Sequence, residues 1–194
     1  MTEVAQLRGL VLAGGQSRRM GKDKAGIDYA GTTLLDRTVK LLQVHIDNVH
    51  VSIRPDQQQD AIRRPHLLIQ DELADIGPAA GILAAHRAYP ASAWFVVACD
   101  LPYLSKTEVS ALIVARRAGH AVTAWSVVQQ SEPEPLCAIY EPGNLASFAA
   151  HVATGGSPSP KAWLKNCDTH LLISDSRRAF TNVNTPEDLN DLEG

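Results

Sequence analysis

Residues 7–24 read LRGLVLAGGQSRRMGKDK, and they give the first indication of how this chain folds. A short apolar run ends in the paired glycines Gly14 and Gly15, which is typical of a buried strand leaving a sheet. Four cations follow, interrupted only by Asp23: Arg18, Arg19, Lys22 and Lys24. Glycines let backbone N–H groups approach an anion, and nearby cations neutralise its charge. The stretch predicts a strand followed by a phosphate-binding loop; an ordinary solvated surface loop is the alternative.

Spacing excludes two familiar phosphate-binding motifs. The P-loop pattern G-x-x-x-x-G-K-[ST] requires one residue fewer between Gly15 and Gly21, and it requires a hydroxyl residue where Asp23 stands. The dinucleotide pattern G-x-G-x-x-G is absent. The segment from Gly14 to Lys24, called the glycine-rich segment below, is longer than a tight strand-to-helix turn. Its charges predict that it wraps a triphosphate.

Strand-like and helix-like segments alternate along the first two thirds of the chain. Apolar runs of strand length occupy 7–14, 48–53, 66–71 and 93–100, and helical patterns occupy 32–46, 78–89 and 105–119. The run AWFVVACD (93–100) is the most continuous, which predicts a central strand buried on both faces. Further on, the pattern predicts strands at 120–128 and 135–141, helices at 144–153 and from Thr185, and a loop at 154–160.

This alternation predicts an α/β fold in which a mostly parallel, doubly wound sheet lies between two helical layers. No repeat and no change of composition marks a boundary, so we expect a single domain over residues 1–194. In such sheets ligands bind at the carboxyl edge, where the strands end.

Composition restricts the partners and the compartment. A formal net charge of −3 and a pI near 6.1 leave no overall positive field for nucleic acid or a membrane surface. The cysteines, Cys99, Cys137 and Cys167, are too far apart for a disulfide framework or a structural zinc site. The N-terminus lacks the order of a signal peptide and no apolar run is long enough to span a membrane. We expect a soluble, cytoplasmic protein.

Two aspartates stand at strand ends. Asp100 follows the run FVVAC, and an aspartate beyond a central parallel strand is well placed to hold Mg²⁺, which prefers one or two carboxylates with phosphate oxygens and waters. A turn or capping role before Pro102 is the alternative. Asp71 ends IQD and could face the same crevice, although acidic residues also commonly end strands.

The stretch NVNTPED (182–188) carries side-chain amides that could read a heterocycle by paired donor and acceptor contacts. Asn182 and Asn184 could equally cap a last helix, and for Thr185 capping is the better interpretation. No constellation of serine, cysteine and histidine indicates covalent catalysis.

The stretch LAGGQSRRMGKDK resembles the signature L-A-G-G-x-S-x-R-M-G-x-D-K of the molybdenum cofactor guanylyltransferases (MobA). The resemblance continues in family order through IQDELADIGPAAGI, CDLPYL, EPLCAIY and FTNVNTPEDL, over nearly the whole chain. It implies a Rossmann-like fold of the nucleotide-diphospho-sugar transferase type. It also implies transfer of GMP from GTP to molybdopterin, which yields the guanine dinucleotide cofactor and pyrophosphate in a Mg²⁺-dependent, in-line reaction.

The resemblance also implies roles for matching positions. Arg19, Lys24 and Asp100 are the implied catalytic residues: Arg19 and Gly15 hold phosphates, Lys24 neutralises charge at the α-phosphate, and Asp100 binds Mg²⁺. Asn182 and Asn184 lie near the pterin. The full set of implied nucleotide-binding residues is Leu12, Ala13, Gly14, Gly15, Lys24, Asp71, Gly77, Pro78 and Asp100.

Two departures from the family pattern affect the site. Where an asparagine-bearing strand end is expected the chain has VSIRPD, so Ser52 or Arg54 must replace that nucleotide contact or it is lost. The usual basic R-V-x-x-F stretch reads SPSPKAWLKN, in which Lys161 and Lys165 could substitute.

Three other functions compete with this one. A cytidylyltransferase for the same cofactor would have Ala-Ala-Gly where this chain has Ala-Gly-Gly, so Gly14 favours GTP. The second alternative is a sugar-phosphate nucleotidyltransferase, and the amide side chains of NVNTPED (182–188) argue against it only weakly. A non-catalytic nucleotide-binding protein that delivers the cofactor would not need both Lys24 and Asp100. The family further implies transient contact with apo-molybdoenzymes or their chaperones.

Overall fold

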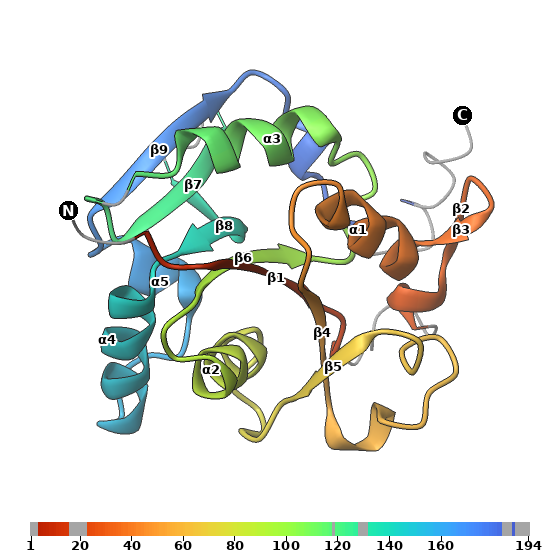
Figure 1. Cartoon of the computed structure of the whole chain (residues 1–194), viewed down its shortest axis with the longest axis horizontal. Helices are drawn as coiled ribbons and strands as arrows, with labels where there is room; N and C mark the ends of the chain where they lie inside the picture. The colour runs from red at the N-terminus through yellow and green to blue at the C-terminus, as the bar shows by residue number, and fades with distance from the viewer. Residues whose placement is uncertain (1–3, 16–22, 118, 128–131, 184–187, 189–194) are drawn as a thin grey trace.

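The computed structural model describes residues 4–15, 23–117, 119–127, 132–183 and 188, and within them the chain forms one seven-stranded sheet with helices on both faces (Figure 1). The strand order is β5-β4-β1-β6-β8-β7-β9. The sheet strands are β1 Leu7–Leu12, β4 Val49–Ile53, β5 Leu67–Gln70, β6 Ala93–Ala98, β7 Val122–Val127, β8 Pro133–Tyr140 and β9 Thr169–Ser174. The α-helices are α1 Leu34–Gln43, α2 Ala79–Ala88, α3 Lys106–Ala115, α4 Pro142–Ala153 and α5 Pro160–Leu164. The predicted α/β architecture is confirmed.

The strands from the first half of the chain are parallel. β1 pairs with β4 on one side and with β6 on the other, and β4 pairs with β5. Every residue of β6 is buried, as its unbroken apolar sequence predicted. The carboxyl ends of these four strands therefore meet at one edge of the sheet.

The other half of the sheet is mixed. β8 runs antiparallel to both β6 and β7, whereas β9 is parallel to β7. β8 lies between two strands that precede it in sequence, and it runs in the opposite direction to both. The register of the β7–β8 pair shifts between Ala124 and Ser126.

Two helical layers cover the sheet (Figure 1). α1 and α3 lie on one face, and α2 and α4 lie on the other. The apolar face of α1 is buried, including Leu34, Leu35 and Leu42. A capping box begins α3, because Ser105 and Glu108 each accept a hydrogen bond from the backbone at the start of the helix.

Several helix boundaries differ from the prediction by one to four residues, and contacts in the folded chain accompany two of these differences. α1 begins at Leu34 rather than at residue 32 because Thr32–Thr33 form β3, which pairs with β2 (Asp28–Tyr29) across a turn where Ala30 and Gly31 have positive φ. Thr33 then accepts a hydrogen bond from the Asp36 N–H at 3.0 Å and caps the helix. α3 ends at Ala115 instead of extending to Gly119, and the next residue, Arg116, binds the Glu141 carboxylate.

The predicted helix starting at Thr185 lies outside the described residues. Among the helices that are described, none is long and apolar enough to cross a lipid bilayer.

Candidate active site

A cavity of about 770 Å³ lies at the carboxyl ends of β1, β4, β5 and β6. It opens at the edge where doubly wound sheets bind ligands. Of the catalytic, nucleotide-binding and pterin-side residues that the family resemblance implies, Arg19 and Asn184 lie outside the described residues. The structure places all the others in the wall of this cavity: Leu12, Ala13, Gly14, Gly15, Lys24, Asp71, Gly77, Pro78, Asp100 and Asn182.

Lys24, Asp100 and Asn182 form a contact group on one side of the cavity. The Lys24 Nζ lies 2.9 Å from Asp100 Oδ2, and Asn182 Nδ2 donates to Asp100 Oδ1 at 3.0 Å. The Lys24 and Asp100 side chains are 17% and 15% exposed, so the pair is accessible from the cleft but shielded from bulk water. The Val183 N–H also donates to the Asp100 carbonyl at 3.0 Å. Asp100, just beyond the end of β6, therefore contacts both Lys24 and residues 182–183, which follow β9.

Asp71 lies on the other side of the cavity, just beyond β5. Its Oδ1 accepts a hydrogen bond from the Ser52 hydroxyl at 2.7 Å. Gly81 at the start of α2 makes this arrangement possible, because a Cβ at that position would lie 2.2 Å from Ser52 Oγ. Burial raises the pKa of Asp71 from 3.8 to about 6, against the opposing effects of the Ser52 hydrogen bond and the Arg54 charge.

Replacement of Asp71 by asparagine should stabilise the folded protein more at neutral than at acidic pH. Because the pKa of Asp71 is higher in the folded state, that state binds more protons between pH 3.8 and about 6, and wild-type stability falls as pH rises through this range. We expect Asp71→Asn to raise Tm by about 2–4 °C at about pH 7.5, corresponding to the order of 1 kcal/mol, and to have little effect at about pH 4.

Thermal unfolding at both pH values, followed by circular dichroism, measures this difference. Asp47→Asn is the control because Asp47 is exposed. An equal change in Tm at both pH values would contradict the assignment of the effect to ionisation of Asp71.

Ser52 and Arg54 have different places in the site. Ser52 is buried, and its hydroxyl donates to the Asp71 carboxylate. Arg54 Nη1 donates to the Gly14 carbonyl, and Arg54 Nη2 lies 2.9 Å from Asp56 Oδ2. Both line the cavity. Of the two, Arg54 is the one that contacts the glycine-rich segment itself.

Lys161 and Lys165 are placed differently from the residues above. Their Nζ atoms lie 2.7 Å and 2.8 Å from the Glu132 carboxylate oxygens, and both side chains are more than half exposed. They lie outside the lining of the 770 Å³ cavity.

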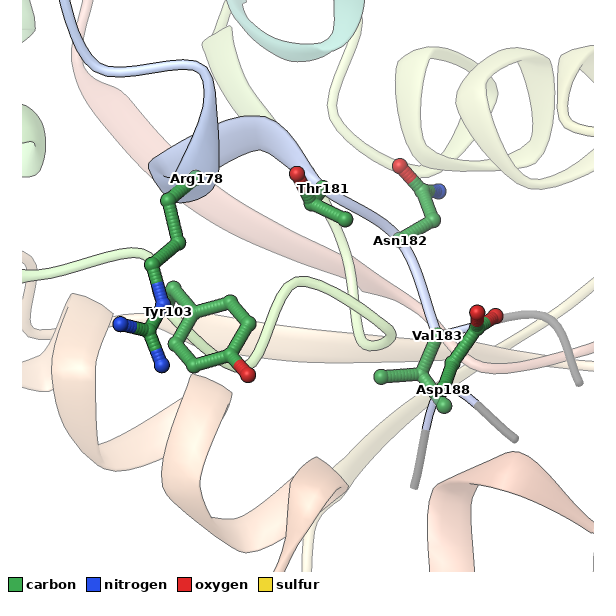
Figure 2. A pocket seen from close by; sticks show the side chains of 6 residues that line it. All are labelled: Tyr103, Arg178, Thr181, Asn182, Val183 and Asp188. Atoms are coloured by element: carbon green, nitrogen blue, oxygen red, sulfur yellow. The ribbon is translucent and has the colours of Figure 1, made fainter. Parts of the chain in front are cut away.

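A second, smaller hollow of about 300 Å³ adjoins Asn182. Figure 2 shows its lining, in which the Arg178 guanidinium lies over the Tyr103 ring, 4.2 Å from the ring centroid. In this view the Asn182 side chain points away from Tyr103 and Arg178. Asn182 is therefore common to the two hollows.

The donor set of the site suits a hard cation held largely by its substrate. Among the described residues, no cluster of three or more His, Cys, Asp or Glu side chains could hold a metal ion by itself. Asp100 supplies one carboxylate at the cleft, and Mg²⁺ typically takes one or two carboxylates and completes its shell with phosphate oxygens and waters. The residues present thus fit a Mg²⁺ ion that arrives with a triphosphate.

Sequence reasoning missed one functional candidate, Arg63. Its guanidinium is fully buried next to the site and contacts both Ala13 and Asp23. Its neighbour Arg64 is exposed, and nothing in the local pattern distinguishes the two arginines. The one available signal was Asp23, the single acidic residue among the four cations of the glycine-rich segment.

Known proteins resemble this chain in sequence. Its sequence over residues 9–172 matches the MobA-like NTP transferase domain. It is 37% identical to a molybdenum cofactor biosynthesis bifunctional protein of Synechocystis sp., over 94% of this chain and 52% of that protein. It is 33% identical to a probable molybdenum cofactor guanylyltransferase of Natronomonas pharaonis, over 93% of this chain and 94% of that protein.

Solved structures share the fold. A crystal structure of molybdopterin-guanine dinucleotide biosynthesis protein A from Archaeoglobus fulgidus matches with a TM-score of 0.78 at 22% identity, covering 96% of each chain. A 4-diphosphocytidyl-2C-methyl-D-erythritol synthase from Anaerococcus prevotii matches with a TM-score of 0.74 at 13% identity, covering 97% of this chain and 94% of that one. These likenesses establish the Rossmann-like nucleotidyltransferase fold. Because the matched domain spans most of the chain and carries the glycine-rich segment and both strand-end aspartates, the protein belongs to the MobA-like NTP transferase family.

Proposed function

We propose that the protein transfers GMP from GTP to molybdopterin, forming the molybdopterin guanine dinucleotide cofactor and releasing pyrophosphate. The observation that carries this proposal is the gathering of Lys24, Asp100, Asp71 and the paired glycines Gly14 and Gly15 around one cleft at the carboxyl edge of the sheet. Membership of the MobA-like family supports it, as do relatives named molybdenum cofactor guanylyltransferase. Residues 1–194 would act as one nucleotidyltransferase domain.

The reaction is an in-line displacement at the α-phosphorus of GTP. An oxygen of the terminal phosphate of molybdopterin forms the new bond to this phosphorus, and the bond to the bridging oxygen breaks, so that pyrophosphate leaves with its electron pair. No covalent enzyme intermediate is needed. Positioning and electrostatic stabilisation of the developing charge therefore supply the catalysis.

Each residue of the cleft has a place in this scheme. The backbone of Gly14 and Gly15 receives the phosphates, and Lys24 neutralises charge at the α-phosphate. Asp100 would hold Mg²⁺, which when bound neutralises phosphate charge as a Lewis acid. Asp71, Gly77 and Pro78 lie on the far side of the cleft, where the nucleoside would bind.

The acceptor would bind on the Asn182 side. Asn182 contacts Asp100 through its amide and borders the second hollow, so it lies between the metal ligand and a free volume of about 300 Å³. Asn184, which the family resemblance also implies near the pterin, lies outside the described residues. Transient contact with apo-molybdoenzymes or their chaperones would follow product formation, in the cytoplasm.

Isothermal titration with GTP, CTP and ATP in the presence of Mg²⁺ tests the nucleotide assignment. We expect GTP to bind at least about tenfold more tightly than the other two, which corresponds to about 1.4 kcal/mol of selectivity. Preference for CTP would replace GMP by CMP in the proposed transfer. Absence of binding to all three would overturn the proposal as a whole.

A further inference from the structure

Arg63 is a fully buried cation at the edge of the cleft. It lies in the turn between a short 3-10 helix (Pro55–Gln57) and β5, and its side chain has no exposed surface. Its Nη2 donates to the Ala13 carbonyl at 2.8 Å. Its Nη1 lies 2.6 Å from Asp23 Oδ2 and 3.1 Å from Asp60 Oδ2. One guanidinium thus joins its own turn to two segments that lie 50 and 40 positions away in the sequence.

These two segments lie at the two ends of the glycine-rich segment. Ala13 is the first residue after β1, and Asp23 immediately precedes Lys24. Nη2 donates to both, because it also lies 2.9 Å from Asp23 Oδ1. One buried group thus fixes the position of the residue that follows β1 relative to the residue that precedes Lys24.

Asp23 connects Arg63 to the short helix that begins at Lys24. The Asp23 Oδ1 accepts a hydrogen bond from the Ala25 N–H at 3.1 Å and thereby caps the short 3-10 helix Lys24–Gly26. The turn that holds Arg63 also packs directly on this helix, because a Cβ at Gly26 would lie 2.7 Å from Ile62 Cδ1. The backbone of Lys24 is therefore fixed from two sides by the segment around Arg63.

Burying the charge of the Arg63 guanidinium carries a desolvation cost. Burial alone lowers the pKa of Arg63, but the hydrogen bond and charge of Asp23, with the charge of Asp60, raise it overall, so the guanidinium stays charged. A buried ion pair is often no more stabilising than apolar residues of similar volume. What the guanidinium adds is a planar fork of donors that can bind a carboxylate and a carbonyl in fixed directions.

We infer that Arg63 is a positioning residue for nucleotidyl transfer: by holding Ala13 and Asp23 together it positions Gly14 and Lys24 for contact with the triphosphate of the nucleotide. This inference rests on the proposed function. It assigns to Arg63 no contact with the substrate. Its effect passes through Asp23 and Lys24.

Three variants separate positioning from a purely structural role. Arg63→Met removes the charge and the donors, and Arg63→Lys keeps the charge but replaces the planar fork of donors by a single ammonium group. Asp23→Asn keeps the helix cap but weakens the link to Arg63. Arg64→Met is the matched control because Arg64 is adjacent and exposed. Thermal unfolding establishes for each variant that the measured protein is folded.

The first measurement compares affinities for GTP and GMP, which share the base and the ribose but differ in the β- and γ-phosphates. We expect Arg63→Met to keep the affinity for GMP and to lose most of the additional affinity for GTP. In the transfer assay kcat should fall about 100-fold, the cost of a misplaced catalytic group. Arg63→Lys and Asp23→Asn should give intermediate losses, and they keep the test decisive if Arg63→Met does not fold.

The second measurement combines Arg63→Met with Lys24→Ala. If Arg63 acts through Lys24, the double variant should be about as slow as Lys24→Ala alone, whereas independent effects would multiply. A lowered Tm with unchanged kcat and an unchanged GTP-to-GMP affinity ratio would overturn the inference while leaving the proposed function intact. A wild-type protein that neither binds GTP nor transfers GMP would overturn both.

Discussion

Lys24→Ala is expected to lower kcat for GMP transfer by about 1,000-fold, at the upper end of the cost of removing one group that stabilises developing charge. The ammonium lies at the wall of the cleft, mostly shielded from water, and the charge that accumulates at the α-phosphate would be left without it. In a site of low dielectric this contribution is larger than the same charge would provide in water. KM for GTP should change far less, because the interaction strengthens in the transition state.

Steady-state rates with GTP and molybdopterin measure this effect. Lys40→Ala is the matched control because Lys40 lies exposed on α1, and it should leave kcat unchanged. If Lys24→Ala retained kcat within about threefold of wild type while the control behaved normally, Lys24 would have no role at the α-phosphate.

Asp100→Asn is expected to reduce Mg²⁺-dependent transfer by at least about 1,000-fold, equivalent to about 4 kcal/mol of transition-state stabilisation. The substitution preserves the shape of the side chain and an oxygen that can accept from Asn182. It removes the negative charge that holds Lys24 and that a Mg²⁺ ion requires. The loss should therefore be chemical and not a consequence of altered packing.

The decisive measurement is transfer activity as a function of Mg²⁺ concentration. Asp100→Asn should shift the half-maximal Mg²⁺ concentration upwards, and high Mg²⁺ should restore part of the rate. Asp47→Asn, at an exposed position, is the control and should follow the wild-type curve. An unchanged Mg²⁺ dependence in Asp100→Asn would remove Asp100 as the metal ligand.

The gathering of Lys24, Asp71 and Asp100 could be predicted because parallel strands end at one edge of a sheet. Hydrophobic runs locate the strand ends, and the residues that follow them must then lie near one another. The same reasoning could not give the direction of β8. The apolar second half of β8, residues 136–140, gives no sign of strand direction, and the orientation depends on pairing with β6 and β7 in the folded chain.

Other features also depend on contacts between distant segments. The β2–β3 hairpin was missed because Thr32 and Thr33 adjoin a strong helical pattern, and the two-residue turn at Ala30 and Gly31 lacks the usual Asn-Gly signal. Arg63 was missed because its partners Ala13 and Asp23 are 50 and 40 positions away. No local pattern encodes such a contact.

The sharing of Asp100 between Lys24 and Asn182 has an evolutionary consequence. Asp100 contacts Lys24 through Oδ2 and Asn182 through Oδ1, and in the proposed function these two residues belong to the nucleotide side and the acceptor side of the cleft. A change that adapts either side to a different substrate also alters the partner of the other side. Positions 24, 100 and 182 would therefore diverge together as a lineage acquires a new acceptor, while the exposed surface varies independently.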